Sequence, residues 1–361
     1  MRRVRPGPLL ALTLAALATS AASSGPAAAK RDPLAAEIEK WSAFVRTHQS
    51  KNEDWDQVKG ITAPVMTDAE AALRSGRRLF ALQRLAAART LLSASLYAGE
   101  RTESQRQDEA AFEAEWARMG KVLRADLSPP SPAALDGIRP AAVRALAEAA
   151  LPQIKIFYDT SLEYARNTLP ASGIFSIGEA RAQREFVVFA RTLSERSSGT
   201  RPPLRSLAPE LDALENRVLA AYRPPASIDK HAEFIGASAT LKEARELDAA
   251  GLRYAALLRY LQAAQRLALL DAKKAPVDAA ALRRLGARLS AGGVDHSIGR
   301  LFLESAEADL AAAASGVVPE RASVIASDVL PRYFAALEPA RPATPRPAAA
   351  VTVTLVRWPY T

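Results

Sequence analysis

Apolar residues recur along most of the chain at the spacing of helices that pack on one face. Three segments carry them at i, i+4, i+7 and i+11, and these stripes begin at Leu34, Phe112 and Leu207. Such a stripe is what an amphipathic helix presents to a hydrophobic core. Three independent matches predict an all-α fold.

Start and stop signals divide this pattern into separate helices. Thr67-Asp68-Ala69-Glu70 is typical of a capping box, and Pro209 suits the first turn of a helix, where a missing amide proton costs little. Pro-Pro pairs indicate connections, because proline disfavours helix continuation. These pairs stand at 129–130, 202–203 and 224–225.

Two segments of the chain are similar to each other. The sequence from Gly76 is GRRLFALQRLAAA and that from Gly251 is GLRYAALLRYLQA. Leu85 and Tyr260 are both large and apolar at matching places. The identical pairs are Gly76/Gly251, Arg78/Arg253, Ala81/Ala256, Leu82/Leu257, Arg84/Arg259 and Ala88/Ala263.

This pattern resembles the turn and second helix of a tetratricopeptide repeat, over residues 67–98 and 240–271. The resemblance implies pairs of helices in which small alanines allow close approach and a large residue fills the space between them. We expect antiparallel helical hairpins in a solenoid-like or irregular bundle arrangement. The helical domain should span 30–338, with a candidate boundary between two sub-domains at 199–226.

The N-terminus has the order of a secretory signal peptide. Arg2, Arg3 and Arg5 precede an uninterrupted run of Leu, Ala and Thr at 9–18, and small residues follow up to Ala29. The run is about half of the ~20 residues that a spanning helix needs. We therefore expect residues 1–29 to be removed, which leaves no transmembrane segment and exports the protein to the periplasm or the cell exterior.

The C-terminus differs from the helical body. Pro339, Pro342 and Pro345 recur every third residue, which favours an extended Pro-rich linker over 339–349. In the tail at 350–361, residues 351–355 alternate apolar and polar side chains, as in a strand. This short extended tail is expected to dock on the helical body, to stay mobile or to add to the sheet edge of a partner.

Charge and composition narrow the range of partners. Removing the three signal arginines from 48 basic residues leaves 45 against 39 acidic ones, a net charge of +6. This modest excess suits an anionic envelope polymer or another envelope protein, whereas no basic cluster interleaved with aromatics points to nucleic acid. Cysteine is absent, which excludes disulfides and thiolate chemistry. Heavy use of Ala and Arg indicates a GC-rich bacterial genome.

Motifs that carry chemistry are missing from the sequence. His48, His231 and His296 are the only histidines, and none has a second ligand at helical spacing. The stretch from Gly173 to Gly178 has one residue too many for a nucleophile elbow, and instead suggests a turn and a helix start. We predict no catalytic, cofactor-binding or metal-binding residues and no cofactor.

A partner surface is the remaining candidate site. Tyr and Arg dominate interface hot spots. Two adjacent Arg-Tyr pairs stand on one predicted helix, and a tryptophan stands in the C-terminal tail. The candidate residues are Arg253, Tyr254, Arg259, Tyr260 and Trp358.

Two functions follow from these features. The first is a non-enzymatic binding or scaffolding protein of the bacterial cell envelope. The alternative is an exported hydrolase of cell-wall glycan or peptide whose carboxylates are dispersed along the sequence. Two facing carboxylates in a deep cleft would favour the hydrolase.

Overall fold

The computed structural model describes residues 32–49, 54–193, 199–225, 227–271, 279–313 and 319–338. The predicted signal peptide, linker and tail, including Trp358, lie outside these residues. From Pro33 onward the described residues belong to one compact unit, and they are helical. No strand occurs among them, since their one extended pairing is an isolated bridge between Thr200 and Val294. The prediction of an all-α fold is confirmed.

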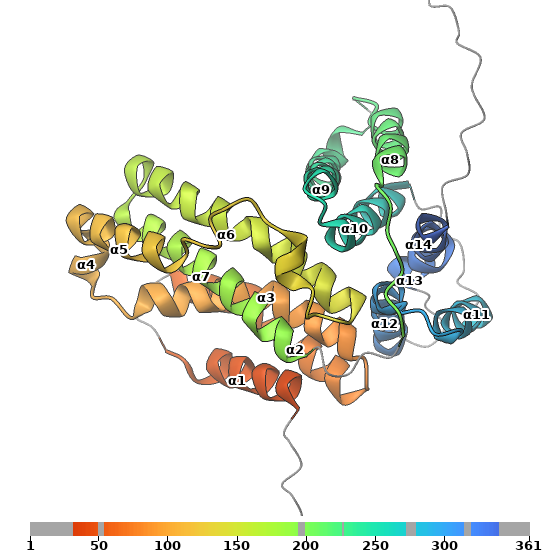
Figure 1. Cartoon of the computed structure of the whole chain (residues 1–361), viewed down its shortest axis with the longest axis horizontal. Coiled ribbons are helices and arrows are strands. Elements are labelled where there is room, and N and C mark those ends of the chain that lie inside the picture. Colours follow the sequence, from red (N-terminus) through yellow and green to blue (C-terminus); the bar gives the residue numbers. More distant parts are fainter. Residues whose placement is uncertain are drawn as a thin grey trace, which may run out of the picture. The chain divides into compact units, whose positions relative to one another are not determined.

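Successive helices of the chain pack side by side. The strongest contacts join α6 to α7, α9 to α10 and α2 to α3 (Figure 1). The elements are α1 (Pro33–Thr47), α2 (Asp54–Arg74), α3 (Arg78–Gly99), α4 (Glu103–Gln107), α5 (Glu109–Val122), η1 (Pro132–Leu135), α6 (Ala141–Asn167), α7 (Pro170–Thr192), α8 (Ala208–Ala221), η3 (Ile228–Lys230), α9 (His231–Ala249), α10 (Arg253–Asp271), α11 (Ala279–Ser290), α12 (Ser297–Ala312), α13 (Glu320–Val324), the π-helical turn η4 (Ile325–Val329) and α14 (Leu330–Leu337).

The predicted apolar stripes lie on α1, α5 and α8 and face the core. Every stripe residue of α1 and α8 is buried, and in α5 only Trp116 keeps partial exposure. Pro209 stands in the first turn of α8, as predicted. The three Pro-Pro pairs all lie in connections between helices.

The helix start predicted at Thr67 is wrong. Thr67 lies inside α2, which begins at Asp54 and runs on to Arg74. Its hydroxyl donates to the carbonyl oxygen of Ala63, one turn earlier, at 3.0 Å. A threonine side chain can bond either to the amides of a new helix or to the preceding turn. Because the residues before Thr67 are already helical, it does the latter.

The two similar segments belong to two pairs of contacting helices, α2 with α3 and α9 with α10, which are joined by the same turn and are called the two hairpins below. Gly76 and Gly251 have φ values of +78° and +75°, a left-handed conformation that favours glycine. After α2, the amide of Arg77 donates to the carbonyl of Ala72, and that of Gly76 donates to Leu73. The same two bonds close α9 in front of α10. Both hairpins therefore use the Schellman motif to end the first helix.

The match extends from the turns to the packing and the ion pairs. The paired positions that the sequence identified in α3 and α10 as Ala, Leu, a large residue and Ala are at most 2% exposed. Arg84 pairs with Asp68 at 2.6 Å, and Arg259 pairs with Glu243 at 2.9 Å. In each hairpin 16 residues separate the two partners.

Each second helix of a hairpin begins on a carboxylate from the other half of the chain, which is half-buried in the first hairpin and buried in the second. Glu304 of α12 accepts the amide of Phe80 in α3 at 2.9 Å. Glu148 of α6 accepts the amide of Ala255 in α10 at 3.0 Å. Phe80 and Ala255 occupy equivalent places in the two hairpins. Thus α6, which comes later in the chain than the first hairpin, caps the second hairpin, and α12, which comes later than the second hairpin, caps the first.

These caps connect the parts of the chain on either side of 199–226. The packing of α6 on α10 and of α3 on α12 spans the same segment. At the start of α6, the amides of Ala141 and Ala142 donate to Asp295 and Ser297 at 2.7 and 2.8 Å. The helical body is therefore held together across this connection by buried polar bonds as well as by apolar contact.

Gly173 and Gly178 do not mark a turn. Both lie inside α7, where they are points of close approach. A Cβ on Gly178 would come within 2.9 Å of the Ala94 backbone in α3, and one on Gly173 within 2.6 Å of the Phe112 ring in α5. The two glycines let α7 pack tightly between its neighbours.

Candidate functional site

A groove of about 430 Å³ lies between the second helices of the two hairpins. Residues of α3 and α10 line it together with residues of α6, and α7, α9, α12 and α13 add a few more. We call it the α3–α10 groove. Apolar side chains of α3, α6 and α7 form part of its lining, among them Leu146, Ala149 and Ala150 of α6 and Phe80 and Phe186. The rest of its lining is rich in arginine and glutamine.

Four arginines line the groove, and three of them are held by carboxylates. The equivalent residues Arg84 and Arg259 form the matching ion pairs of the two hairpins. Arg321 of α13 bonds to Asp309, whose hydrogen bonds raise the pKa of the guanidinium. Nε of Arg84 is buried and has no hydrogen-bond partner within the described part of the chain. One donor in the groove is thus left without an acceptor.

The fourth arginine, Arg266, is exposed and makes no ion pair with any described residue. Its Nη1 lies against α9 at Gly236, where an added Cβ would come within 2.9 Å. Gly236 therefore leaves room for the guanidinium beside the helix. Since no described residue forms an ion pair with it, the Arg266 guanidinium gives this end of the groove an unpaired positive charge.

Five glutamines supply most of the remaining polar groups of the groove. Gln262 accepts from Arg259 at 2.8 Å, and Gln183 donates to Thr90 at 3.0 Å. Carboxamides both donate and accept, whereas guanidinium groups only donate. The five are Gln83, Gln153, Gln183, Gln262 and Gln265.

The groove has the chemistry of a binding site for an anion. None of the described residues that line it is acidic, and N–H donors outnumber acceptors. Planar guanidinium groups match carboxylate and phosphate oxygens with two parallel bonds. The flat apolar patch from α6 offers contact for the uncharged part of a ligand.

The residues predicted from sequence as a partner surface have separate roles. Arg253 and Tyr254 donate to the carbonyls of Leu204 and Pro202 at 3.0 and 2.9 Å, and so fasten the connection before α8. Arg259 lines the groove. Tyr260 is 2% exposed and its hydroxyl accepts from Arg332. Tyr260 therefore contributes to the core, and burial raises the pKa of its phenol.

Several carboxylates with perturbed pKa values lie elsewhere in the body. Burial raises the pKa of Glu148 and of Glu304, although the helix amides that they cap lower it. Burial raises that of Glu179 to about 7. None of these three lines the groove. The first two have a structural role that accounts for their burial.

The histidines lie among aromatic rings. His48 stacks on Phe44 with ring centroids 4.5 Å apart, and Nδ1 of His296 lies 3.0 Å from the Tyr333 hydroxyl. Among the described residues, no three metal-ligating side chains gather in one place. None of the helices described is both long enough and apolar enough to cross a membrane.

Sequence reasoning missed most of the groove. Arg266, Arg321 and the glutamines carry no local motif, and they meet only because seven separate helices fold around one space. The signal that was present is the identity of Arg84 and Arg259 within the two similar segments. No family model, curated protein or solved structure matches the chain. What the fold and the site define is an all-helical protein with two matched hairpins and an arginine-lined groove between them.

Proposed function

We propose that this chain is a non-enzymatic binding protein of the bacterial cell envelope that holds an anionic partner in the α3–α10 groove. The observation that carries the proposal is the lining itself, with four arginines, five glutamines and no acidic residue among those described. The partner is an acidic segment of another envelope protein or an anionic envelope polymer. Export of the chain rests on the predicted signal peptide at 1–29.

Repeat-like hairpins support a binding role. Stacked pairs of helices create extended surfaces whose shape is set by packing and not by flexible loops. Here the tetratricopeptide-like turn and second helix are used twice, so that α3 and α10 present equivalent arginines to one groove. This arrangement fixes the position of the guanidinium groups before a ligand arrives, which reduces the entropy lost on binding.

Hydrolysis gains no support from the groove. The dispersed-carboxylate alternative needs two acidic groups on either side of a substrate, about 5–10 Å apart. The groove lacks such a pair among its described lining residues.

The test compares binding of a labelled poly-L-glutamate to the whole chain and to two variants by fluorescence anisotropy. Arg266→Gln should weaken binding about 5- to 10-fold, since one charge-assisted hydrogen bond contributes roughly 1–1.5 kcal/mol at an exposed site. The matched control is Arg245→Gln on α9, where the guanidinium is tied to Asp212 and Glu215. It should bind as well as the parent.

Binding should also weaken with added salt, because salt screens exposed charges. Equal losses in the two variants would mean that net charge alone governs binding, and would refute a specific groove. Release of soluble fragments from cell-wall glycan by the purified chain would instead support the hydrolase.

A further inference from the structure

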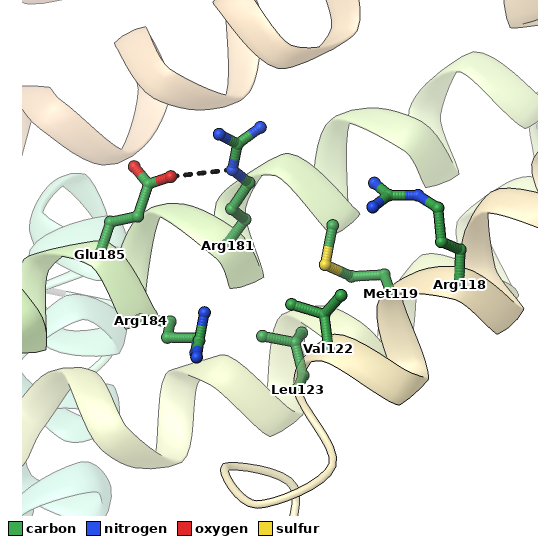
Figure 2. Close-up of a pocket in the computed structure, with 7 residues that line it drawn as sticks. All are labelled: Arg118, Met119, Val122, Leu123, Arg181, Arg184 and Glu185. Carbon is green, nitrogen blue, oxygen red and sulfur yellow. Dashed lines mark hydrogen bonds and ion pairs between the residues drawn. The ribbon is translucent and has the colours of Figure 1, made fainter.

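A second hollow, of about 330 Å³, lies between α5 and α7 (Figure 2). We call it the α5–α7 hollow. Arg118 extends from α5 beside it, and Arg181 and Arg184 extend from α7, with Glu185 as the one carboxylate among the lining residues. The same hollow is lined by the apolar side chains of Met119, Val122 and Leu123.

Each of its arginines is held by a carboxylate, and Arg118 also donates to the Tyr97 hydroxyl at 3.3 Å. Nε of Arg181 donates to Glu185 at 2.8 Å, and Nε of Arg184 donates to Asp126 at 3.0 Å. Within the described residues, no acceptor bonds the Nη atoms of these two arginines. Arg118 is held at 2.7 and 2.8 Å by Glu115. The guanidinium groups are thus oriented by their carboxylates while several N–H donors remain available.

Further positive charge lies behind the hollow. Arg101 bonds Glu115 at 2.5 Å, so that Glu115 is shared between two arginines. Burial lowers the pKa of Arg101, and the charges of Arg118 and Arg181 lower it further, whereas Glu100 acts in the opposite direction. Arginines that repel one another in this way are stabilised when an anion binds among them.

Apolar surface adjoins these donors. Val122 exposes 44% of its surface at the hollow, although it is a large apolar residue at the end of α5. Met119 and Leu123 beneath it are buried. A ligand that places only an anion here would leave Val122 in water. A ligand with an alkyl chain would cover it and gain from burial of apolar surface.

We propose that the α5–α7 hollow binds a small amphiphile whose oxyanion head group, a phosphate monoester or a carboxylate, lies between the arginines while its alkyl chain covers Val122. A hollow of this size holds on the order of ten non-hydrogen atoms at ~30 Å³ for each water-sized group. It is separate from the α3–α10 groove, so this binding does not depend on the function proposed above.

The experiment measures binding of three probes to the full chain by isothermal titration calorimetry. Hexyl phosphate combines both features, inorganic phosphate carries only the head group, and hexanol carries only the chain. Hexyl phosphate should bind at least about tenfold more tightly than either of the others, because head and chain each contribute. Equal affinity for hexyl phosphate and inorganic phosphate would overturn the proposal that the ligand is an amphiphile. Absence of hexyl phosphate binding would overturn the proposal that the α5–α7 hollow is a binding site.

Variants locate the binding. Arg184→Gln should weaken hexyl phosphate about tenfold through loss of a charge-assisted bond. Val122→Asn should weaken the binding of hexyl phosphate but leave the binding of inorganic phosphate unchanged. Arg245→Gln is the matched control, since it removes an exposed ion-paired arginine on α9. Unchanged binding of hexyl phosphate to Arg184→Gln would overturn the assignment.

An experiment with lipid vesicles distinguishes the two sources of such a head group, a membrane lipid and a free metabolite. Co-sedimentation with vesicles that contain phosphatidate, but not with phosphatidylcholine alone, and its loss in Arg184→Gln would identify a membrane lipid as the source. Binding of hexyl phosphate in solution without co-sedimentation would identify a free metabolite.

Discussion

Glu148 provides the sharpest test of the reciprocal caps. Its side chain is 1% exposed and bonds both Nε of Arg144, at 2.7 Å, and the amide of Ala255, at 3.0 Å. Glu148→Ala removes the buried acceptor for both donors. Arg144 keeps its bonds to Asp136 and to the carbonyls of Leu135 and Pro132 in η1, so that it stays in position without its main buried partner.

The cost follows from these two bonds. Loss of the charge-assisted bond to Arg144 costs roughly 1.5–3 kcal/mol, and an unsatisfied buried amide at Ala255 costs roughly 1–3 kcal/mol. Their sum agrees with the ~3–5 kcal/mol measured when one partner of a buried ion pair is removed. We expect Glu148→Ala to lower the free energy of unfolding by about 3–5 kcal/mol. Glu148→Gln should cost less, about 1–3 kcal/mol, since its one oxygen serves only one donor.

The assay is equilibrium unfolding in urea at pH 7, followed by circular dichroism at 222 nm. The slope against denaturant should not change, because the surface exposed on unfolding is the same. The control is Asp159→Asn, which breaks an exposed pair with Lys155 on the same helix and should cost less than about 0.5 kcal/mol. If the free energy of unfolding of Glu148→Ala lies within about 1 kcal/mol of that of this control, Glu148 does not cap α10 and the reasoning fails.

Other predictions concern glycines and pH. Gly60→Ala, in the open middle of α2, should raise stability by about 1 kcal/mol, whereas Gly76→Ala at φ +78° should lower it by about 1–2 kcal/mol in the same urea assay. Gly178→Ala should cost about 1–3 kcal/mol in thermal unfolding, because its Cβ meets the Ala94 backbone. Burial raises the pKa of Glu179 from 4.5 to about 7, so the folded chain binds its proton more tightly than the unfolded chain. Stability should therefore fall as pH rises between these two values, and Glu179→Gln should flatten that fall in unfolding curves at pH 5 and 8.

Local pattern was enough to predict the helices but not all of their ends. The spacing of the buried residues Leu34, Ile38 and Trp41 reflects which side of α1 meets the core, and this periodicity can be recognised in the sequence alone. A capping box is less specific. Thr67 has the same neighbours whether it starts a helix or continues one, and the difference depends on the packing of the turn before it.

The reciprocal caps and the α3–α10 groove were less predictable, because their parts are far apart in sequence. The Glu148 oxygen and the Ala255 amide are 107 residues apart, and Glu304 and Phe80 are 224 apart. Neither carboxylate belongs to a local motif. By contrast, Arg259 could be selected from the sequence because it stands in a segment with a visible copy. Its role differs from that of Tyr260 beside it, since neighbouring residues on a helix point in different directions.

The reciprocal caps have a consequence for a chain cut in two. If the connection at 199–225 were cleaved, each fragment would keep one capping glutamate and one hairpin whose first amides need the glutamate of the other fragment. Apart, both fragments would carry an apolar face and unpaired groups, and should be poorly folded. Mixed together, they should reassemble at equal stoichiometry into a helical complex, so that this protein is a candidate for splitting into a complementing pair.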